Sequence, residues 1–369
     1  MGLRRWLTGR AVRATRVLVL ECPGFWDVRV AAERALSARG WRVADSPASA
    51  DVLLVAGPAT GELAEVVERL WDALPGPRAR TNLIDVAAAG EALDAAERHL
   101  RDEDAQRADA EARSRPAGGG DHEEMDHESM GHGHMDHESM DDGDMGHEGM
   151  DHGDMDMAPD GIPLAEGSEE DRDGLEMDEL PLRLGPVLPG WPAGLVLEVT
   201  LHGDLVVGAV GRLVGDPAAG EPGDVGPAAA RWCDDVASVL ALAGDDVGAS
   251  GARRARDAVL DGREDVAASL VRALRHRVEQ SWTLRWSLGG AAPVTADRAL
   301  EIGAGGDVVG DCRDRLLVLL DRAAGGARAG HQAVPPETVA SLVTGLDLGV
   351  ARLLVASLGS ATAQEAVDA

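Results

Sequence analysis

The chain of 369 residues carries 35 basic and 65 acidic side chains, which gives a formal net charge of −30 at pH 7. This acidity argues against nucleic acid as a partner, because the carboxylates would repel phosphates. The length allows two domains and a linker, and a hydrophobic content of 44% is enough to build their cores. With one Phe and no Tyr, those cores must consist mainly of Leu, Val and Ala.

The first hundred residues alternate strand and helix signals. Val52–Ala56 is continuously hydrophobic, as expected of a central parallel strand. Gly40 and the run Pro75-Gly76-Pro77 are typical helix ends. We predict strands at 17–20, 41–44, 52–56 and 82–86, with helices at 28–38 and 63–74. This alternation favours an α/β domain with a small parallel sheet over residues 1–100.

An acidic linker is predicted to follow over residues 101–180. A charged helical pattern runs to residue 112, and the sequence from Pro116 to Gly120 then opens the linker proper. Residues 121–180 hold 23 carboxylates against Arg172 alone, so the rest of the chain carries only about −8. We expect this linker to be disordered, because its composition cannot bury enough apolar surface.

Residues 121–155 form a five-residue repeat, DHEEM DHESM GHGHM DHESM DDGDM GHEGM DHGDM. A period of five fits neither a helix nor a strand, so the repeat cannot bury one face. Its Met-x-His pairs offer thioether and imidazole donors for Cu(I), and imidazole with carboxylate suits Cu(II), Ni or Zn. The alternative is a low-complexity linker produced by repeat slippage. The candidate metal ligands are His122, Met125, His127, Met130, His132, His134, Met135, His137, Met145, His147, Met150 and His152.

The second domain, residues 181–369, is predicted to be a mainly α-helical α+β domain. Strands at 195–201 and 204–210 flank the turn His202-Gly203 and should form a hairpin. Helical spacing predicts helices at 228–243, 265–279 and 313–323, and a fourth that begins at Pro335 and continues to Leu346. The expected architecture is a β-hairpin packed on a helical bundle.

The cysteines exclude the common metal motifs. Cys22, Cys233 and Cys312 lie far apart without a CxxC pair, so no zinc ribbon or iron–sulfur ligand set is present. Scattered cysteines indicate a reducing compartment. Without a signal peptide or a run of about 18 apolar residues, we expect a protein of the cytoplasm or of the cytoplasmic face of the membrane.

Segment 50–78 carries a more specific pattern. A strand ends in Gly57-Pro58-Ala59-Thr60, and a helix with Arg69 and Trp71-Asp72 is followed by Pro75-Gly76-Pro77. This pattern resembles the small cluster-bearing subunit of respiratory complex I (NADH-quinone oxidoreductase) and of related membrane-bound nickel–iron hydrogenases. The resemblance implies an iron–sulfur cluster, which needs about four thiolates. Only Cys22 falls near a family ligand position, so we expect no cluster and regard Cys22 as a vestigial ligand candidate.

Residues 182–207 resemble the opening hairpin of the partner subunit of the same enzymes, the large quinone-site or hydrogenase-type subunit. The matching positions are Gly185-Pro186, Pro189, Gly194 and Gly203-Asp204. In the family, this subunit binds quinone through a hairpin His and a Tyr, or nickel through two CxxC pairs. Here the hairpin has Leu188, Trp191 and Pro192, and the chain has neither Tyr nor CxxC.

Together the two resemblances imply a degenerate fusion of two subunits with most catalytic ligands missing. We expect a non-catalytic component or assembly partner of a complex I-like or hydrogenase-like assembly, with peripheral membrane association through its partner subunits. Two alternatives stay open. The chain could bind copper or nickel through the repeat, or it could be an oxidoreductase subunit whose ligands another chain completes. No catalytic residue is assigned.

Overall fold

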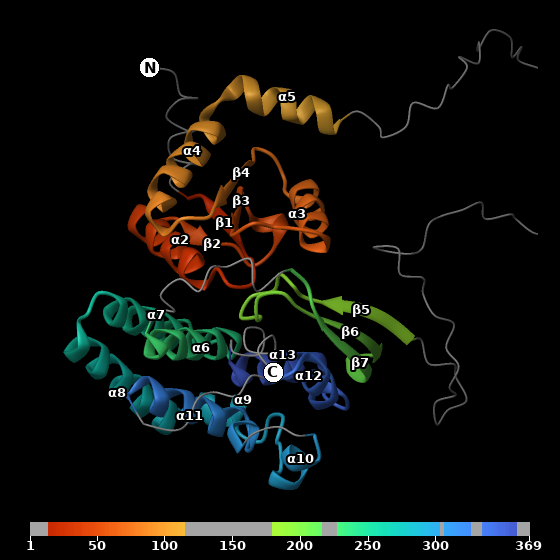
Figure 1. Ribbon diagram of the computed structural model, residues 1–369, viewed down its shortest axis with the longest axis vertical. Coiled ribbons are helices and arrows are strands. Elements are labelled where there is room, and N and C mark those ends of the chain that lie inside the picture. The colour runs from red at the N-terminus through yellow and green to blue at the C-terminus, as the bar shows by residue number, and fades with distance from the viewer. Residues whose placement is uncertain (1–13, 115–178, 216–226, 303–305, 326–333, 360–369) are drawn as a thin grey trace, which may run out of the picture.

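The computed structural model describes residues 14–114, 179–215, 227–302, 306–325 and 334–359. Two halves lie against each other (Figure 1): an α/β half at the top and a mainly helical half with a small sheet below it. The structure thus confirms the predicted division into a parallel α/β part and a mainly helical part. Residues 115–178 of the predicted linker, with all twelve candidate metal ligands, lie outside the described residues.

The first half is built on a parallel sheet with strand order β2-β1-β3-β4. Helices α2 and α4 pack on one face through residues such as Val28 and Leu93, and α3 packs on the other through Leu63 and Val67. The strands are β1 (Arg16–Glu21), β2 (Arg42–Val43), β3 (Val52–Ala56) and β4 (Ala79–Leu83). The helices are α2 (Trp26–Arg39), α3 (Glu62–Ala73), α4 (Ala89–Arg101) and α5 (Glu103–Arg113).

The last strand of this sheet lies three residues earlier than predicted. We expected residues 82–86, whereas β4 ends at Leu83 and pairs Ala79 and Leu83 with the two ends of β3. Ile84 is 67% exposed and Val86 begins a short 3-10 helix. The apolar run NLIDV was therefore misleading, because β3 ends at Ala56 and offers no ladder partner beyond Leu83.

Two elements fall inside the range 101–180 that was assigned to the linker. Helix α5 is held to the α/β half by Arg78, whose guanidinium contacts Asp109 at 2.9 Å and whose backbone N–H donates to Gln106. Strand β5 begins at Glu179, two residues before the predicted start of the second domain at residue 181. The described residues therefore include both ends of the range 101–180, and α4 and α5 together cover the charged helical pattern that was predicted up to residue 112.

The second half opens with an antiparallel sheet in the order β5-β6-β7. The predicted hairpin is present, with Gly203 in the turn at a φ of 63°. Strand β5, which we did not predict, adds to its other edge and pairs Leu184 with Leu197. The strands are β5 (Glu179–Leu184), β6 (Leu195–His202) and β7 (Leu205–Leu213).

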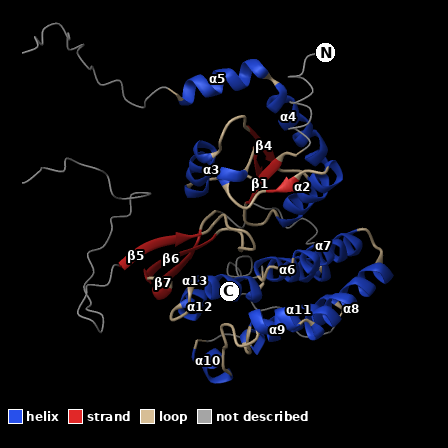
Figure 2. Ribbon diagram, turned by 180° about the vertical axis from the view of Figure 1, so that it is seen from behind, coloured by secondary structure: helices blue, strands red, loops and turns tan. Residues whose placement is uncertain are grey.

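The helices of this half gather around α6, whose buried side chains include Val236 and Leu240. Figure 2 shows α6 and α7 beside the small sheet and α9, α10 and α11 lower in the view. Their bounds are α6 (Ala228–Leu242), α7 (Asp246–Leu260), α8 (Glu264–Gln280), α9 (Trp282–Leu288), α10 (Ala296–Glu301), α11 (Cys312–Ala323), α12 (Pro336–Val343) and α13 (Leu348–Leu358). Within the described ranges, none of the helices combines the length and the apolar character needed to cross a bilayer.

The predicted helices α6, α8 and α11 are confirmed, but the final one differs. We expected a single helix from Pro335 to Leu346. Instead α12 ends at Val343, and a turn with Gly345 at a φ of 87° separates it from α13. The turn forms because Gly345 and Leu346 exchange backbone hydrogen bonds with Val206 of β7.

Candidate functional site at the interface of the two halves

The carboxyl ends of β1 and β3 define the expected ligand position in the α/β half. These neighbouring strands lead to helices on opposite faces, α2 after β1 and α3 after β3. Open α/β sheets bind their ligands in the crevice at such a switch point. Here the switch point lies at Cys22 and Gly57, the residues that directly follow the two strands.

This crevice is filled by side chains of the chain itself. Gly57 has a φ of 104°, and a Cβ there would lie 2.6 Å from the Phe25 ring and 2.7 Å from the Cβ of Cys22. Cys22 is 2% exposed, and its backbone N–H donates to the carbonyl of Ala56 at 2.8 Å. Burial and the neighbouring Glu21 raise the pKa of the Cys22 thiol to about 12. A thiol in this state is a poor nucleophile and a poor metal ligand at neutral pH.

The second half closes the crevice from outside. Pro23 approaches two glycines of the second half so closely that a Cβ on Gly194 would lie 2.6 Å from its ring, and one on Gly215 3.0 Å. Val196 and Val214 share a buried apolar cluster with Leu63 and the strands of the first half. The two halves therefore share one continuous core at the edge where an α/β protein would hold its ligand.

Beside this edge lies a buried network of ionised side chains, which we call the interface charge cluster: Glu21, Arg29, Glu33, Asp234 and Arg256. Arg29 contacts Glu21 and Glu33 at 2.5 Å each and also pairs with Asp234. Arg256 reaches Glu33 at 2.6 Å and Asp234 at 2.7 Å. The two arginines thus bridge α2 of the first half to α6 and α7 of the second.

Trp26 of α2 adds an apolar part to the contact between the two halves. Its indole N–H donates to Asp234 at 3.0 Å, and its ring packs with Val30, Ala230, Val259 and Leu260. The guanidinium of Arg231, which belongs to α6 of the second half, lies 4.9 Å from the ring centroid. An apolar contact therefore shields the charges from water, which strengthens their mutual attraction.

The carboxylates of the cluster differ in their protonation. Burial alone would raise the pKa of Asp234, but Arg29 and Arg256 outweigh it and hold that pKa well below its usual range. The same two guanidinium groups lower the pKa of Glu33 against the effect of burial. Burial dominates at Glu21 and raises its pKa, although Arg29 opposes the shift. Glu21 is therefore the carboxylate of the cluster that takes up a proton most readily.

The three cysteines and the candidate metal ligands of the repeat do not form a common site among the described residues. Cys22 belongs to the core shared by the two halves, whereas Cys233 and Cys312 lie in the core of the second half. The described ranges contain no group of three or more His, Cys, Asp or Glu side chains arranged to hold a metal ion. The repeat ligands from His122 to Met150 and His152 are outside those ranges.

Sequence analysis missed the interface charge cluster. One signal was present: Trp26, Arg29 and Glu33 recur at helical spacing on α2, a helix otherwise rich in Val, Ala and Leu. Another was the pair Asp234-Asp235 in the middle of the apolar helix α6. Neither signal could identify the other as its partner, because the two lie more than 200 residues apart.

Comparison with known proteins adds no relative. Neither a family description, nor a curated protein, nor a solved structure matches this chain significantly. The resemblance to complex I and hydrogenase subunits therefore stays a hypothesis that rests on the sequence patterns of segments 50–78 and 182–207.

Proposed function

We propose that this protein is a non-catalytic component or assembly partner of a redox complex of the complex I or hydrogenase type. In this proposal the two halves correspond to a small and a large subunit joined in one polypeptide. Its role is to present a preassembled two-subunit surface to other chains. Electron transfer and quinone or nickel chemistry are assigned to those partners.

One observation carries the proposal most directly. The switch point of the parallel sheet, where a ligand would bind, is occupied by Phe25 and Cys22 and covered by Gly194 and Gly215 of the second half. A site that received a cofactor would need space for it next to Gly57. Closure of this edge by the second half favours a permanent contact between the halves over a ligand site.

The buried ion pairs between the two halves also support a scaffold role. Arg256 is 2% exposed and is paired with carboxylates from both halves. Buried charges of this kind are costly to separate, so they favour a fixed arrangement of the halves. A rigid pairing suits a scaffold, whereas a catalytic cleft between two domains usually has to open for its substrate.

Anaerobic purification of the affinity-tagged full chain from its native host tests the proposal. We expect identified oxidoreductase subunits to co-purify in fixed stoichiometry, and iron and sulfide to remain with those subunits after the complex is dissociated. The separated chain should lack the absorbance of an iron–sulfur cluster. About four irons and four sulfides on the separated chain would contradict the proposal.

The repeat supports a second candidate function, copper or nickel capture. Seven pentads place Met and His side chains at intervals along residues 121–155, and many weak sites in series bind with avidity. Under this alternative the folded halves are a carrier for the repeat. Slower growth under copper stress of a strain with the repeat deleted, but not of a strain with the interface disrupted, would favour it.

A further inference from the structure

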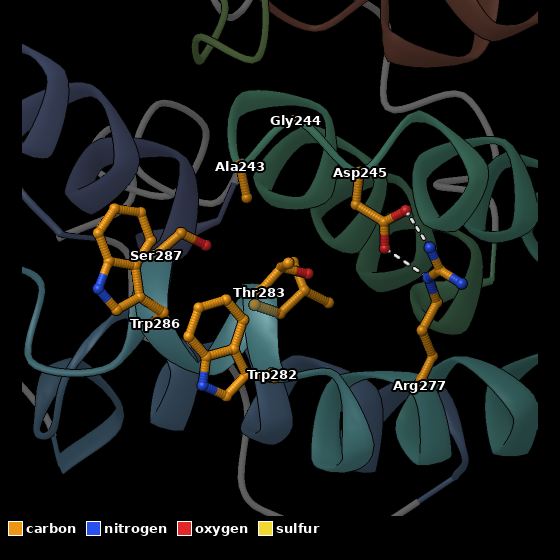
Figure 3. A pocket seen from close by; sticks show the side chains of 9 residues that line it. Ala243, Gly244, Asp245, Arg277, Trp282, Thr283, Trp286 and Ser287 are labelled. Atoms are coloured by element: carbon orange, nitrogen blue, oxygen red, sulfur yellow. Dashed lines mark hydrogen bonds and ion pairs between the residues drawn. The ribbon is translucent and has the colours of Figure 1, made fainter.

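An exposed aromatic surface on α9 is unexplained by the interface and by the proposed function. Trp282 and Trp286 are 73% and 77% exposed. They lie four residues apart, so their indoles occupy the same face of the helix. Figure 3 shows both rings along one side of an open cleft, with the Asp245–Arg277 pair on the other side. The cleft has a volume of about 490 Å³.

The helix holds these two rings in a fixed position. Leu284 and Leu288, on the opposite face of α9, are 3% and 0% exposed and belong to the core of the second half. The Ser281 hydroxyl caps the helix by accepting from the N–H of Leu284 at 3.2 Å. The exposure of the indoles is thus imposed by the packing of the helix and does not result from fraying.

The segment that carries the rings is basic in an otherwise acidic protein. Residues 271–288 contain four arginines and a single glutamate. Arg277 is neutralised by Asp245 at 2.5 and 2.7 Å, and Arg275 pairs with Glu279 and Asp321. Arg272 and Arg285 form no ion pair among the described residues, and both are exposed. Arg285 lies between the two tryptophans in sequence and on their face of the helix.

We propose that α9 is a docking surface for an anionic lipid bilayer. Tryptophan has an apolar body and a polar N–H, and it concentrates at the level of lipid headgroups. Arginines beside such rings attract anionic headgroups and contribute over about one Debye length, roughly 8 Å at physiological salt. Arg285, which shares α9 with both rings, lies within that range of a lipid surface on which the rings rest. This inference does not depend on the proposed function.

The walls of the cleft favour a lipid surface over a protein partner. Protein interfaces place exposed tryptophans at the centre of a well-packed apolar patch. Here the rings border a cleft with the Asp245–Arg277 ion pair on its other side, and the hydroxyl side chains of Thr283 and Ser287 lie beside the rings on α9. A headgroup layer, which is itself polar and hydrated, fits such a surface without leaving buried polar groups unpaired.

Flotation of the full chain with lipid vesicles tests the docking surface. One vesicle preparation is phosphatidylcholine alone, and the other includes phosphatidylglycerol. We expect binding to the anionic vesicles, weakened by salt, and quenching of tryptophan emission by brominated lipid. The double variant Trp282→Ala/Trp286→Ala should bind about tenfold more weakly and lose the quenching. Arg285→Gln should weaken binding about fivefold, as expected for one arginine near an anionic surface.

Two matched variants serve as controls. Leu300→Ala removes a side chain that is 77% exposed on α10, and Arg254→Gln removes an exposed arginine of α7. Both should bind the anionic vesicles as the unsubstituted chain does, and circular dichroism should show that all variants are folded. Absence of vesicle binding would overturn the proposal, as would equal binding by the double variant. Self-association that is lost in the double variant, without lipid binding, would instead identify a second copy as the occupant.

Discussion

Arg29 of α2 and Asp234 of α6 form an ion pair across 205 positions of sequence, at the boundary between the two halves. Asp234 also accepts from Trp26 of the first half and pairs with Arg256 of the second. One carboxylate thus serves two guanidinium groups and an indole from both sides of the interface. We therefore expect the attachment of the halves to depend on this residue more than on the exposed ion pairs between them.

Asp234→Asn should destabilise the protein strongly. The substitution leaves Arg29 and Arg256 buried with less than their full complement of negative charge, and breaking a buried pair in this way costs about 3–5 kcal/mol. Urea unfolding followed by circular dichroism measures the change. Arg34→Gln is the matched control, because the Arg34–Asp261 pair also joins the halves but is 39% and 34% exposed. It should change the free energy of unfolding by less than about 1 kcal/mol. Equal effects of the two substitutions would disprove the special role of Asp234.

The interface charge cluster should make stability fall in acid. Asp234 has a lowered pKa in the folded protein, so its contribution is complete above the unfolded value of about 3.9 and is lost as the pH falls through the lower folded value. Glu33 acts in the same direction. Melting temperatures measured from pH 7 downwards should therefore drop below about pH 4, and Asp234→Asn should flatten that drop. If the melting temperature of the variant falls below about pH 4 as steeply as that of the unsubstituted protein, other carboxylates cause the fall.

Glu21 should have the opposite pH dependence. Its pKa is raised in the folded protein, so its contribution is fully present below the unfolded value of about 4.3 and is lost as the pH rises through the folded value. Glu21→Gln should therefore remove a loss of stability that the unsubstituted protein shows on going from pH 4 towards neutrality. Thermal unfolding of both proteins over this range tests the sign. A variant that loses more stability than the unsubstituted protein as the pH rises would contradict it.

Gly57→Ala should be far more harmful than Gly61→Ala, although both glycines lie in the same loop and both have a positive φ. A Cβ on Gly57 collides with Phe25 and Cys22, whereas a Cβ on Gly61 meets nothing within 4 Å. We expect a loss of about 2–4 kcal/mol for Gly57→Ala and about 1 kcal/mol for Gly61→Ala. Chemical denaturation of both variants measures the difference. Comparable values would mean that the edge of the sheet has space to adjust, and hence room for a ligand.

The sequence predicted the parallel sheet well because burial on both faces leaves continuous apolar runs such as Val52–Ala56. Prediction from sequence failed where tertiary packing decides the structure and local hydrophobic patterns do not. Helix α7 was missed because its buried face is made of Gly248, Gly251 and several alanines, whose small side chains are not recognised as core residues in the way that Leu or Val is. The interface charge cluster was missed because its members come from one strand and three helices that only the tertiary fold brings together. Local patterns carry no information about such partners.

Substitution of the repeat should separate metal binding from folding. The change replaces all seven His of residues 121–155 by Gln and all seven pentad Met by Leu, which removes the imidazole and thioether donors but retains the carboxylates. We expect copper binding to disappear, because carboxylates alone attract cations with little selectivity for copper. The described halves contribute no competing group of three metal-ligating side chains.

Isothermal titration with Cu(I) under anaerobic conditions, on both proteins, measures this effect. In the unsubstituted chain, binding should weaken as the pH falls through about 6–7, because protonated imidazole cannot coordinate a metal. Urea unfolding should give the same midpoint for both proteins, since the substitutions lie outside the cores of the two halves. Copper binding of undiminished strength in the substituted protein would place the sites in the folded halves and refute a role of the repeat in metal capture.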